Sequence, residues 1–240
     1  MLKNNLNKHP IIPFIMTGDD TIEKTLEMAD FYISNGIMAM EIGVPFSDPT
    51  ADGPVIQRAS SRAIKNGSSI QDSLRVVSAI KEKHPHVSVY LMSYLNPILT
   101  IDNKHIIDSN VDGLIIPDMP IEEFSILNMD IPIIGLIPIN TCEERIKKIC
   151  DKSGSFIYLV SNIGTTGASD FDYAYIYQTL ERIRRNSDLP VAIGFGINSK
   201  EKVNYFKNDF DGIIIGSHFV ELAYENDMTS IYEIIKKTAI

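Results

Sequence analysis

Cysteine is scarce in this sequence, and its placement excludes a disulfide framework. The 240 residues contain only two cysteines, Cys142 and Cys150, which fall within one expected helix. Such a pair has the spacing of neither a disulfide-rich scaffold nor a zinc site. We therefore expect free thiols in a reducing compartment.

Long apolar runs, basic clusters and linkers are also missing. No run approaches the roughly 20 apolar residues of a membrane-spanning helix, and the N-terminus MLKNNLNKHP lacks the apolar core of a signal peptide. The net charge of −9 argues against nucleic acid or an anionic membrane as the main partner. These absences predict a soluble, cytoplasmic protein. A phosphorylated small molecule is still compatible with this charge, because backbone N–H groups bind phosphate without lysine or arginine.

The five histidines are not spaced as metal ligands. His84 and His86 flank a proline between an expected helix and strand, and His218 lies close to a late glycine turn. His9 and His105 are expected to be exposed. Since no aspartate or glutamate cluster accompanies them, we predict no metal site.

The sequence does contain a repeated alternation of apolar and amphipathic segments. The apolar runs are mostly continuous, as parallel strands covered on both faces require, and the segments between them carry charges on one side at helical spacing. The expected strands are residues 11–17, 37–44, 87–94, 111–117, 131–139, 155–161, 191–196 and 212–216. The expected helices include residues 21–34, 70–83, 141–152, 175–185 and 200–208, with Thr141 and Ser199 placed as N-caps.

Eight strand–helix repeats predict a parallel sheet, either closed into a barrel or open and doubly wound. An open dinucleotide-binding fold would carry GxGxxG after its first strand, whereas the turn here reads TGDD. Regular spacing and late glycine turns favour the closed form. We expect a single α/β domain over residues 1–240, a (β/α)8 TIM barrel with a parallel eight-stranded core and outer helices.

In such barrels the active site lies at the C-terminal ends of the strands, and the second expected strand carries a carboxylate there. Glu41 interrupts an apolar run and shares an alternating face with Ala39 and Gly43. Burying a lone carboxylate is costly. Glu41 could thus be structural, paired with a lysine or arginine or turned outward, or functional. The small neighbours leave room beside it and favour function.

The loop that follows, residues 45–54, is rich in Pro, Asp and Gly, which is typical of functional βα loops. Of its two aspartates, Asp48 and Asp52, we expect at least one to serve only in a turn or a helix cap. Tyr94 ends the third strand, where packing is the structural alternative to ligand contact. Asp118 ends the fourth and is expected to cap a helix.

Glycine turns follow the last three expected strands. Tyr158 lies in the sixth strand, and the GTTG that follows it, residues 164–167, suits a lid that closes on a ligand. The seventh strand ends in GFGI and the eighth in IIIGS. Because glycine lets the backbone approach a ligand, and because many barrels hold phosphate after strands seven and eight, we expect a phosphorylated ligand.

The segment LEMADFYISNGIMAMEIGVPFSDPTADGPVIQRAS, residues 26–60, is similar to the most diagnostic segment of the tryptophan synthase alpha chain family. The similarity continues in order through LMSYLNPI, GLIIPDMP, YLVSNIGTTG, GFGI and GIIIGS, and covers nearly the whole chain. It implies a lyase that cleaves indole-3-glycerol phosphate to indole and glyceraldehyde 3-phosphate. It also implies an α2β2 heterotetramer with the tryptophan synthase beta chain. Pyridoxal phosphate is then expected only in that partner, and no cofactor in this chain.

The resemblance also assigns roles by motif position. Glu41 matches the acid/base glutamate, Asp52 the second catalytic carboxylate and Tyr158 the active-site tyrosine. The remaining expected substrate-binding residues are Phe14, Met92 and Phe195 around indole, Gly167, Gly196, Gly216 and Ser217 around phosphate, and Tyr94 and Thr166. Loop residues 45–52 are expected to face the partner. Two departures stand out: Asn162 replaces an arginine common in the lid, and TGDD replaces AGDP or LGDP.

Bond cleavage would need a proton delivered to indole C3, stabilisation of the resulting cation, and removal of a hydroxyl proton. Glu41, with its pKa raised by desolvation, suits both proton transfers, and an ionised Asp52 suits the indole N–H. Two other phosphosugar barrels are disfavoured. A pentose-phosphate epimerase would need a metal-binding His/Asp set, which is absent, and an indole-glycerol-phosphate synthase would need a catalytic lysine in a strand, but no expected strand core contains one. The sequence is also compatible with a barrel that only activates a partner subunit and with a lyase that acts alone.

Overall fold

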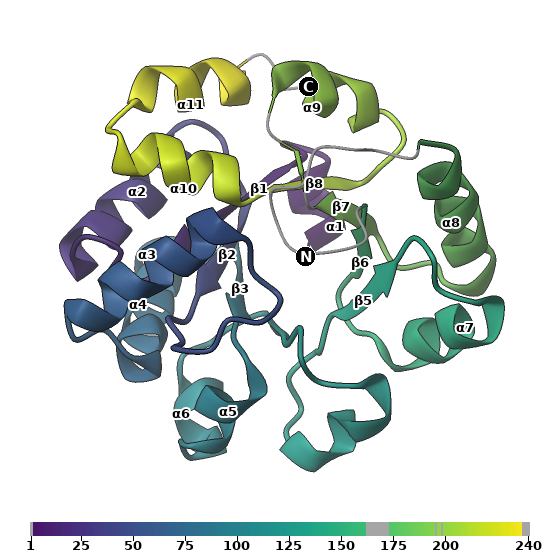
Figure 1. Ribbon diagram of the computed structural model, residues 1–240, viewed down its shortest axis with the longest axis horizontal. Helices are drawn as coiled ribbons and strands as arrows, with labels where there is room; N and C mark the ends of the chain where they lie inside the picture. The colour runs from purple at the N-terminus through teal and green to yellow at the C-terminus, as the bar shows by residue number, and fades with distance from the viewer. Residues whose placement is uncertain (1, 162–172, 195, 198, 237–240) are drawn as a thin grey trace.

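Eight short parallel strands form a barrel inside a ring of helices (Figure 1). The computed structural model describes residues 2–161, 173–194, 196–197 and 199–236. Each of the eight expected strands is confirmed with somewhat shorter bounds. They are β1 (Ile11–Met16), β2 (Ala39–Gly43), β3 (Ser88–Met92), β4 (Gly113–Ile115), β5 (Gly135–Pro138), β6 (Ile157–Val160), β7 (Val191–Gly194) and β8 (Gly212–Ile215).

The strand order is β4-β3-β2-β1-β8-β7-β6-β5, so strands adjacent in sequence pair, except β4 and β5, and β1 pairs with β8. Between the two outer strands of this order, a parallel bridge joins Leu114 in β4 to Ile133, just before β5. Two backbone hydrogen bonds of 2.8 Å flank the bridge. The sheet is therefore closed, and the open doubly wound alternative is wrong.

Helices cover the outside of the barrel. The five expected helices are present with adjusted bounds: α2 (Ile22–Ser34), α4 (Ile70–Lys83), α7 (Glu143–Lys152), α8 (Tyr173–Asn186) and α9 (Lys200–Phe206). The others are α1 (Leu2–Leu6), α3 (Pro54–Lys65), α5 (Leu95–Leu99), α6 (Asn103–Asp108), the 3-10 helix η1 (Ile121–Leu127), α10 (Ser217–Tyr224) and α11 (Met228–Lys236). Within the described ranges, none is long and apolar enough to cross a membrane.

Three capping predictions have different outcomes. The hydroxyl of Ser199 accepts from the N–H of Lys202, which confirms it as the N-cap of α9. Thr141 is not the cap of α7, because that position belongs to Cys142 and the Thr141 hydroxyl donates to a turn carbonyl at 2.7 Å. Asp118 is not an N-cap residue either, because Pro120 precedes η1 and Tyr94 precedes α5; its carboxylate instead accepts from the N–H of Leu95, the first residue of α5, at 2.9 Å.

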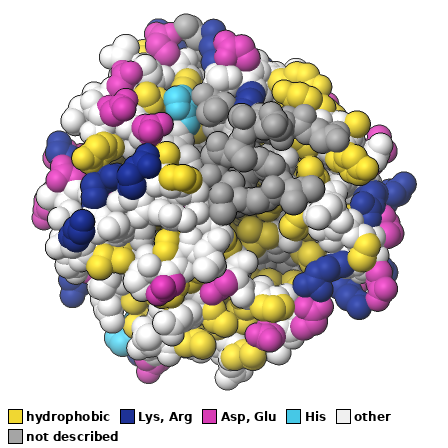
Figure 2. All heavy atoms as spheres, in the orientation of Figure 1, with side chains coloured by type: hydrophobic (Ala, Val, Ile, Leu, Met, Phe, Trp, Pro, Cys, Tyr) yellow, Lys and Arg dark blue, Asp and Glu magenta, His cyan; other side chains and the backbone are white. Residues whose placement is uncertain are grey.

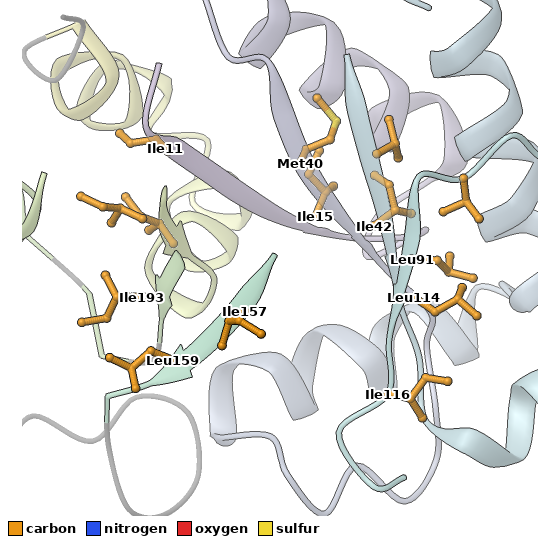
Figure 3. Packing of buried hydrophobic residues seen from close by; sticks show 14 of the residues in the cluster. Ile11, Ile15, Met40, Ile42, Leu91, Leu114, Ile116, Ile157, Leu159 and Ile193 are labelled. Carbon is orange, nitrogen blue, oxygen red and sulfur yellow. The ribbon is translucent and has the colours of Figure 1, made fainter. Parts of the chain in front are cut away.

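Alternation along the strands divides the core into two layers. Ten outward residues, labelled in Figure 3, pack in the layer between strands and helices; they are Ile11, Ile15, Met40, Ile42, Leu91, Leu114, Ile116, Ile157, Leu159 and Ile193. Ala39, Tyr90 and Tyr158 belong instead to the cluster inside the barrel. Because side chains alternate in a strand, Glu41 lies on the inner face.

Helix α1 closes the N-terminal end of the barrel. Leu2 and Leu6 join the inner apolar cluster. Between them, the Asn5 amide donates to the Met38 carbonyl at 3.1 Å, the His86 carbonyl at 2.9 Å and Ser88 Oγ at 3.0 Å. A single side chain thereby satisfies acceptors from two connections that enter β2 and β3.

The prediction that His9 is exposed is wrong, whereas His105 is exposed as expected. His9 is buried after α1; its Nδ1 accepts from the Ile11 N–H at 3.2 Å, and its Nε2 lies 3.2 Å from the Ile235 carbonyl. Burial lowers the pKa of His9 despite that carbonyl. Its ring therefore ties the first strand to the last helix.

Replacing Asn5 by alanine is expected to lower the free energy of unfolding by about 1–3 kcal/mol, because buried acceptors lose their donor. Urea unfolding followed by circular dichroism measures it. Asn66→Ala is the matched control, since exposed Asn66 also donates to two carbonyls but water can replace it. Equal losses in the two variants would contradict the role given to Asn5.

Candidate active site

Glu41 lies in the middle of β2 and points into the barrel. It pairs in register with Phe14 on β1 and with Tyr90 on β3. Its side chain is 1% exposed, and among the described residues its Oε1 has no hydrogen-bond partner. The outward-facing alternative is therefore wrong, and no described lysine or arginine pairs with this carboxyl.

Burial controls the protonation of Glu41. Desolvation raises its pKa from 4.5 to about 8, because the charged form loses the hydration that it has in water. At neutral pH the group is mostly a neutral acid, which is the form able to donate a proton. The direction of this shift agrees with the one expected from the sequence.

Asp52 lies in the loop between β2 and α3 and has a more polar environment. It is 8% exposed. Its Oδ2 accepts from the Tyr94 hydroxyl at 3.0 Å, and that hydroxyl accepts from the Ala51 N–H at 2.9 Å. Burial raises the pKa of Asp52 to about 6, with the Tyr94 hydrogen bond acting in the opposite direction. Above that pH the group is mainly ionised. Near pH 7 the Glu41 carboxyl is therefore mostly neutral and the Asp52 carboxyl mostly negative.

Tyr94 therefore does more than pack. Its ring stacks on Phe46 with centroids 5.1 Å apart, and its hydroxyl fixes both the loop backbone and the Asp52 carboxylate. Asp48, in the same loop, is exposed and accepts a 2.7 Å hydrogen bond from the neighbouring Ser47 hydroxyl. It is the turn carboxylate of the pair, as expected for one of the two.

Tyr158 enters the site from β6. It is 3% exposed, and a side chain at Gly194 on β7 would collide with its hydroxyl. Burial, together with the negative charges that Glu41 and Asp52 can carry, raises the pKa of Tyr158 well above its usual value. The phenol is thus neutral and close enough to both carboxyls to feel their charge.

The two late glycine turns lie at the same end of the barrel. Gly196 has φ +75°, a conformation that other residues adopt only with strain, and its carbonyl accepts from the Lys202 ammonium at 2.8 Å. Gly216 is the N-cap residue of α10, and Ser217 is the first residue of that helix. A Cβ at Gly216 would be 3.8 Å from the Phe14 Cβ, which places this turn near the β1 residue paired with Glu41.

Phe14 and Met92 supply apolar walls. The Phe14 ring lies over Gly43, where any side chain would collide with it. It also lines a cavity of about 760 Å³ between β1 and the helices α2, α3 and α10, but Glu41, Asp52 and Tyr158 are not among the residues that line this cavity. Met92 ends β3 and packs against the cluster inside the barrel and against a second cluster, which joins Phe14 to residues of α3 and α10. Met92 thus lies at the end of its strand, whereas Phe14 lies within β1 beside Glu41.

Three expected substrate-binding residues, Thr166, Gly167 and Phe195, lie outside the described residues, as does Asn162. Figure 2 shows charged side chains spread over much of the face that it draws, interspersed with hydrophobic ones. Within the part of the chain that the structure describes, no three His, Cys, Asp or Glu side chains are grouped so as to hold a metal ion.

Sequence reasoning missed two residues that shape the site. Ser60 is buried in α3; its hydroxyl accepts from the Phe46 N–H and donates to the Phe46 carbonyl, both at 2.8 Å. It was missed because α3 itself was missed, although Pro54 just after Gly53 is a helix-start signal. The other residue is Tyr90, which pairs with Glu41. The same strand alternation that assigned Glu41 to the inner face could also have assigned Tyr90 to that face.

Comparisons with known proteins give a consistent match over nearly the whole chain. Residues 2–239 match the family model described as tryptophan synthase alpha chain. The tryptophan synthase alpha chain of Bacillus velezensis is 37% identical over 220 residues, which cover 88% of this chain and 82% of the relative. That of Bacillus cereus is 36% identical over 240 residues, covering 96% and 93%.

Solved structures give the same family. A tryptophan synthase structure from Mycobacterium tuberculosis superposes with a TM-score of 0.89 at 26% identity, covering 99% of this chain and 96% of that one. A structure of the tryptophan synthase α2β2 complex from Pyrococcus furiosus gives a TM-score of 0.82 at 33% identity, covering 96% of each chain.

The raised pKa of Glu41 predicts a pH-dependent stability. Between pH 4.5 and about 8 the unfolded chain has lost the Glu41 proton while the folded chain keeps it. The folded state therefore binds more protons, and stability falls as pH rises, by about 1.4 kcal/mol per pH unit from this group alone. Below pH 4.5 the carboxyl is protonated in both the folded and the unfolded chain, so none of this stability is lost.

The measurement is the difference in unfolding free energy between wild type and Glu41→Gln from pH 4 to 9. The unfolding free energy of wild type is expected to fall steadily relative to that of Glu41→Gln as the pH rises to about 8, and the difference is then expected to level off. Exposed Glu181→Gln serves as the control for replacing a glutamate by glutamine. A flat difference for Glu41→Gln would show that its carboxyl titrates normally.

Proposed function

Since this chain belongs to the tryptophan synthase alpha chain family, we propose that it cleaves indole-3-glycerol phosphate to indole and glyceraldehyde 3-phosphate. The observation that carries the proposal is the buried carboxyl of Glu41, whose Oε1 has no hydrogen-bond partner among the described residues and whose pKa is raised by desolvation. It lies at the barrel end that also holds an ionisable Asp52 and two glycine turns. That combination suits a carbon–carbon lyase acting on a phosphorylated substrate.

Glu41 is the proposed acid and base. Its protonated carboxyl delivers a proton to indole C3, which turns the bond between C3 and the glycerol carbon into one that can break. Electrons of that bond return to the indole ring as the carbon–carbon bond cleaves. The carboxylate left on Glu41 takes the proton of the hydroxyl on the departing carbon, which becomes the aldehyde. One group thereby serves both transfers, and it ends in its starting state.

Asp52 is the proposed stabiliser of the intermediate cation. Protonation at C3 spreads positive charge onto the indole nitrogen, and an ionised carboxylate accepting that N–H stabilises it. The Tyr94 hydroxyl holds this carboxylate at 3.0 Å, so little reorganisation is needed when charge develops. The neutral Tyr158 phenol lies near both carboxyls and is proposed to orient them or the substrate.

The glycine turns are the proposed phosphate site. Gly196, Gly216 and Ser217 offer backbone N–H groups at one end of the barrel, where helix α10 begins. N–H groups at a helix start attract anions. Holding the phosphate fixes the glycerol chain relative to Glu41, and such orientation contributes strongly to rate. Phe14 and Met92 would line the indole end.

We further propose that the chain acts in an α2β2 complex with a tryptophan synthase beta chain, to which indole passes. Similarity to the Pyrococcus furiosus complex supports this. Loop residues 45–52 are the proposed contact, because Asp52 and the Ser60-anchored Phe46 both belong to it. The proposed cleavage uses side chains and backbone alone, and pyridoxal phosphate is assigned to the partner. None of the eight described strands contains a lysine, which disfavours an indole-glycerol-phosphate synthase.

Glu41→Gln is expected to lower kcat for indole release at least about 100-fold, because glutamine cannot exchange the proton. The assay follows indole formed from indole-3-glycerol phosphate. The matched control is exposed Glu181→Gln, which should retain wild-type turnover. Near-normal turnover by Glu41→Gln would remove the assignment of acid and base.

Addition of a tryptophan synthase beta chain is expected to give a stable complex by size-exclusion chromatography and to raise the rate of indole formation. The physical reason is that contact with residues 45–52 would order the loop that positions Asp52. Absence of a complex at micromolar concentrations, with indole released freely, would favour a stand-alone lyase instead. Complex formation without any lyase activity would favour a partner-activating barrel.

A further inference from the structure

Tyr90 is the side chain next to Glu41 on the inner face of β3. The two residues pair in register across the parallel strands β2 and β3, so their side chains are neighbours inside the barrel. Tyr90 is 1% exposed and belongs to the inner apolar cluster. Tyr90 is not among the proposed substrate-binding residues, so we consider its effect on the neighbouring Glu41.

The Tyr90 ring is held by contacts on the far side of the barrel. Its hydroxyl lies 2.6 Å from Ser155 Oγ, just before β6. Its ring meets Phe156 edge-on, with centroids 5.0 Å apart and planes at 79°. On β4, a Cβ at Gly113 would lie 3.1 Å from Tyr90 Cδ1, so the ring occupies the space that a larger residue there would need. The phenol therefore spans from β3 toward β6.

Beneath this ring lies a sealed end of the barrel. Ser88, two residues before Tyr90 on the same inner face, accepts from the Asn5 amide at 3.0 Å. Leu2 and Leu6 of α1 complete the closure. Because β3 runs away from this closed end, Tyr90 lies one step further into the barrel than Ser88, in register with Glu41.

We propose that Tyr90 is a positioning residue for Glu41: its braced ring forms a dry floor that holds the carboxyl at the substrate end and excludes water from below. The proposal rests on the acid/base role given to Glu41 above. The Tyr90 hydroxyl is directed to Ser155, so the ring, and not the hydroxyl, performs this role.

The groups that face Glu41 from neighbouring elements are few. Among the described residues, the titratable side chains that feel the charge of Glu41 are Tyr158 from β6 and Tyr90 itself, and Asp52 acts on the same Tyr158 phenol. The facing residue of β1 is Phe14, which carries no charge. Truncation of Tyr90 leaves Tyr158 and Asp52 in place. Hydration of the cavity so made would stabilise the Glu41 carboxylate and lower its pKa toward the ordinary value.

The experiment compares Tyr90→Ala with Tyr90→Phe. The pH dependence of kcat for indole release has a basic limb set by loss of the Glu41 proton. For Tyr90→Ala this limb is expected to move down by about one pH unit or more. Tyr90→Phe keeps the ring and should keep the wild-type limb. The proposal is overturned if the basic limb of kcat in Tyr90→Ala lies at the wild-type pH, or if it shifts equally in Tyr90→Ala and Tyr90→Phe.

A second readout needs no activity. The pH at which the stability difference from the corresponding Glu41→Gln variant levels off reports the folded pKa of Glu41. It should fall in Tyr90→Ala and stay unchanged in Tyr90→Phe. If Tyr90→Ala does not fold, Tyr90→Leu is tested in the same way, with a smaller shift in the same direction. Absence of lyase activity in the wild type would remove the proposed function, while this titration would still decide the role of Tyr90.

Discussion

The candidate site depends on the desolvation of one carboxyl, Glu41, in the interior of a closed barrel. Its Oε1 finds no hydrogen-bond partner within the part of the chain that the structure describes, which disfavours the charged form. Glycines on the inner face make the arrangement possible, because Gly43 admits the Phe14 ring and Gly194 admits the Tyr158 hydroxyl. Large aromatic rings thereby surround a group that would otherwise hydrate. The result is an acid that keeps its proton near neutral pH.

A second carboxyl in a different environment completes the chemistry. Asp52 is nearly as buried as Glu41 but accepts a hydrogen bond from Tyr94, which favours its charged form. A neutral acid and an ionised base can then coexist within one pocket. The same Tyr94 hydroxyl also accepts from the loop backbone. The charge state of Asp52 is therefore coupled to the conformation of the loop that would meet a partner subunit.

Sequence reasoning located the strands and the face of Glu41, because parallel strands buried on both sides are continuously apolar and side chains alternate along them. The residue pattern alone could not separate Asp52 from Asp48, although the family resemblance did, since the partner that distinguishes them, Tyr94, lies just after β3, 42 positions along the chain. The burial of His9 was hidden for the same reason, as its contact is with Ile235. Helix α3 was overlooked because its start was read as part of a Pro- and Gly-rich loop.

The most direct test of this account is a carboxyl 13C NMR titration of protein labelled at glutamate, with the Glu41 resonance assigned by its loss in Glu41→Gln. The account predicts that this resonance titrates near pH 8. A midpoint near 4.5, as for an exposed glutamate, would contradict it, because a carboxylate already ionised at neutral pH could not supply the proton on which the proposed cleavage depends.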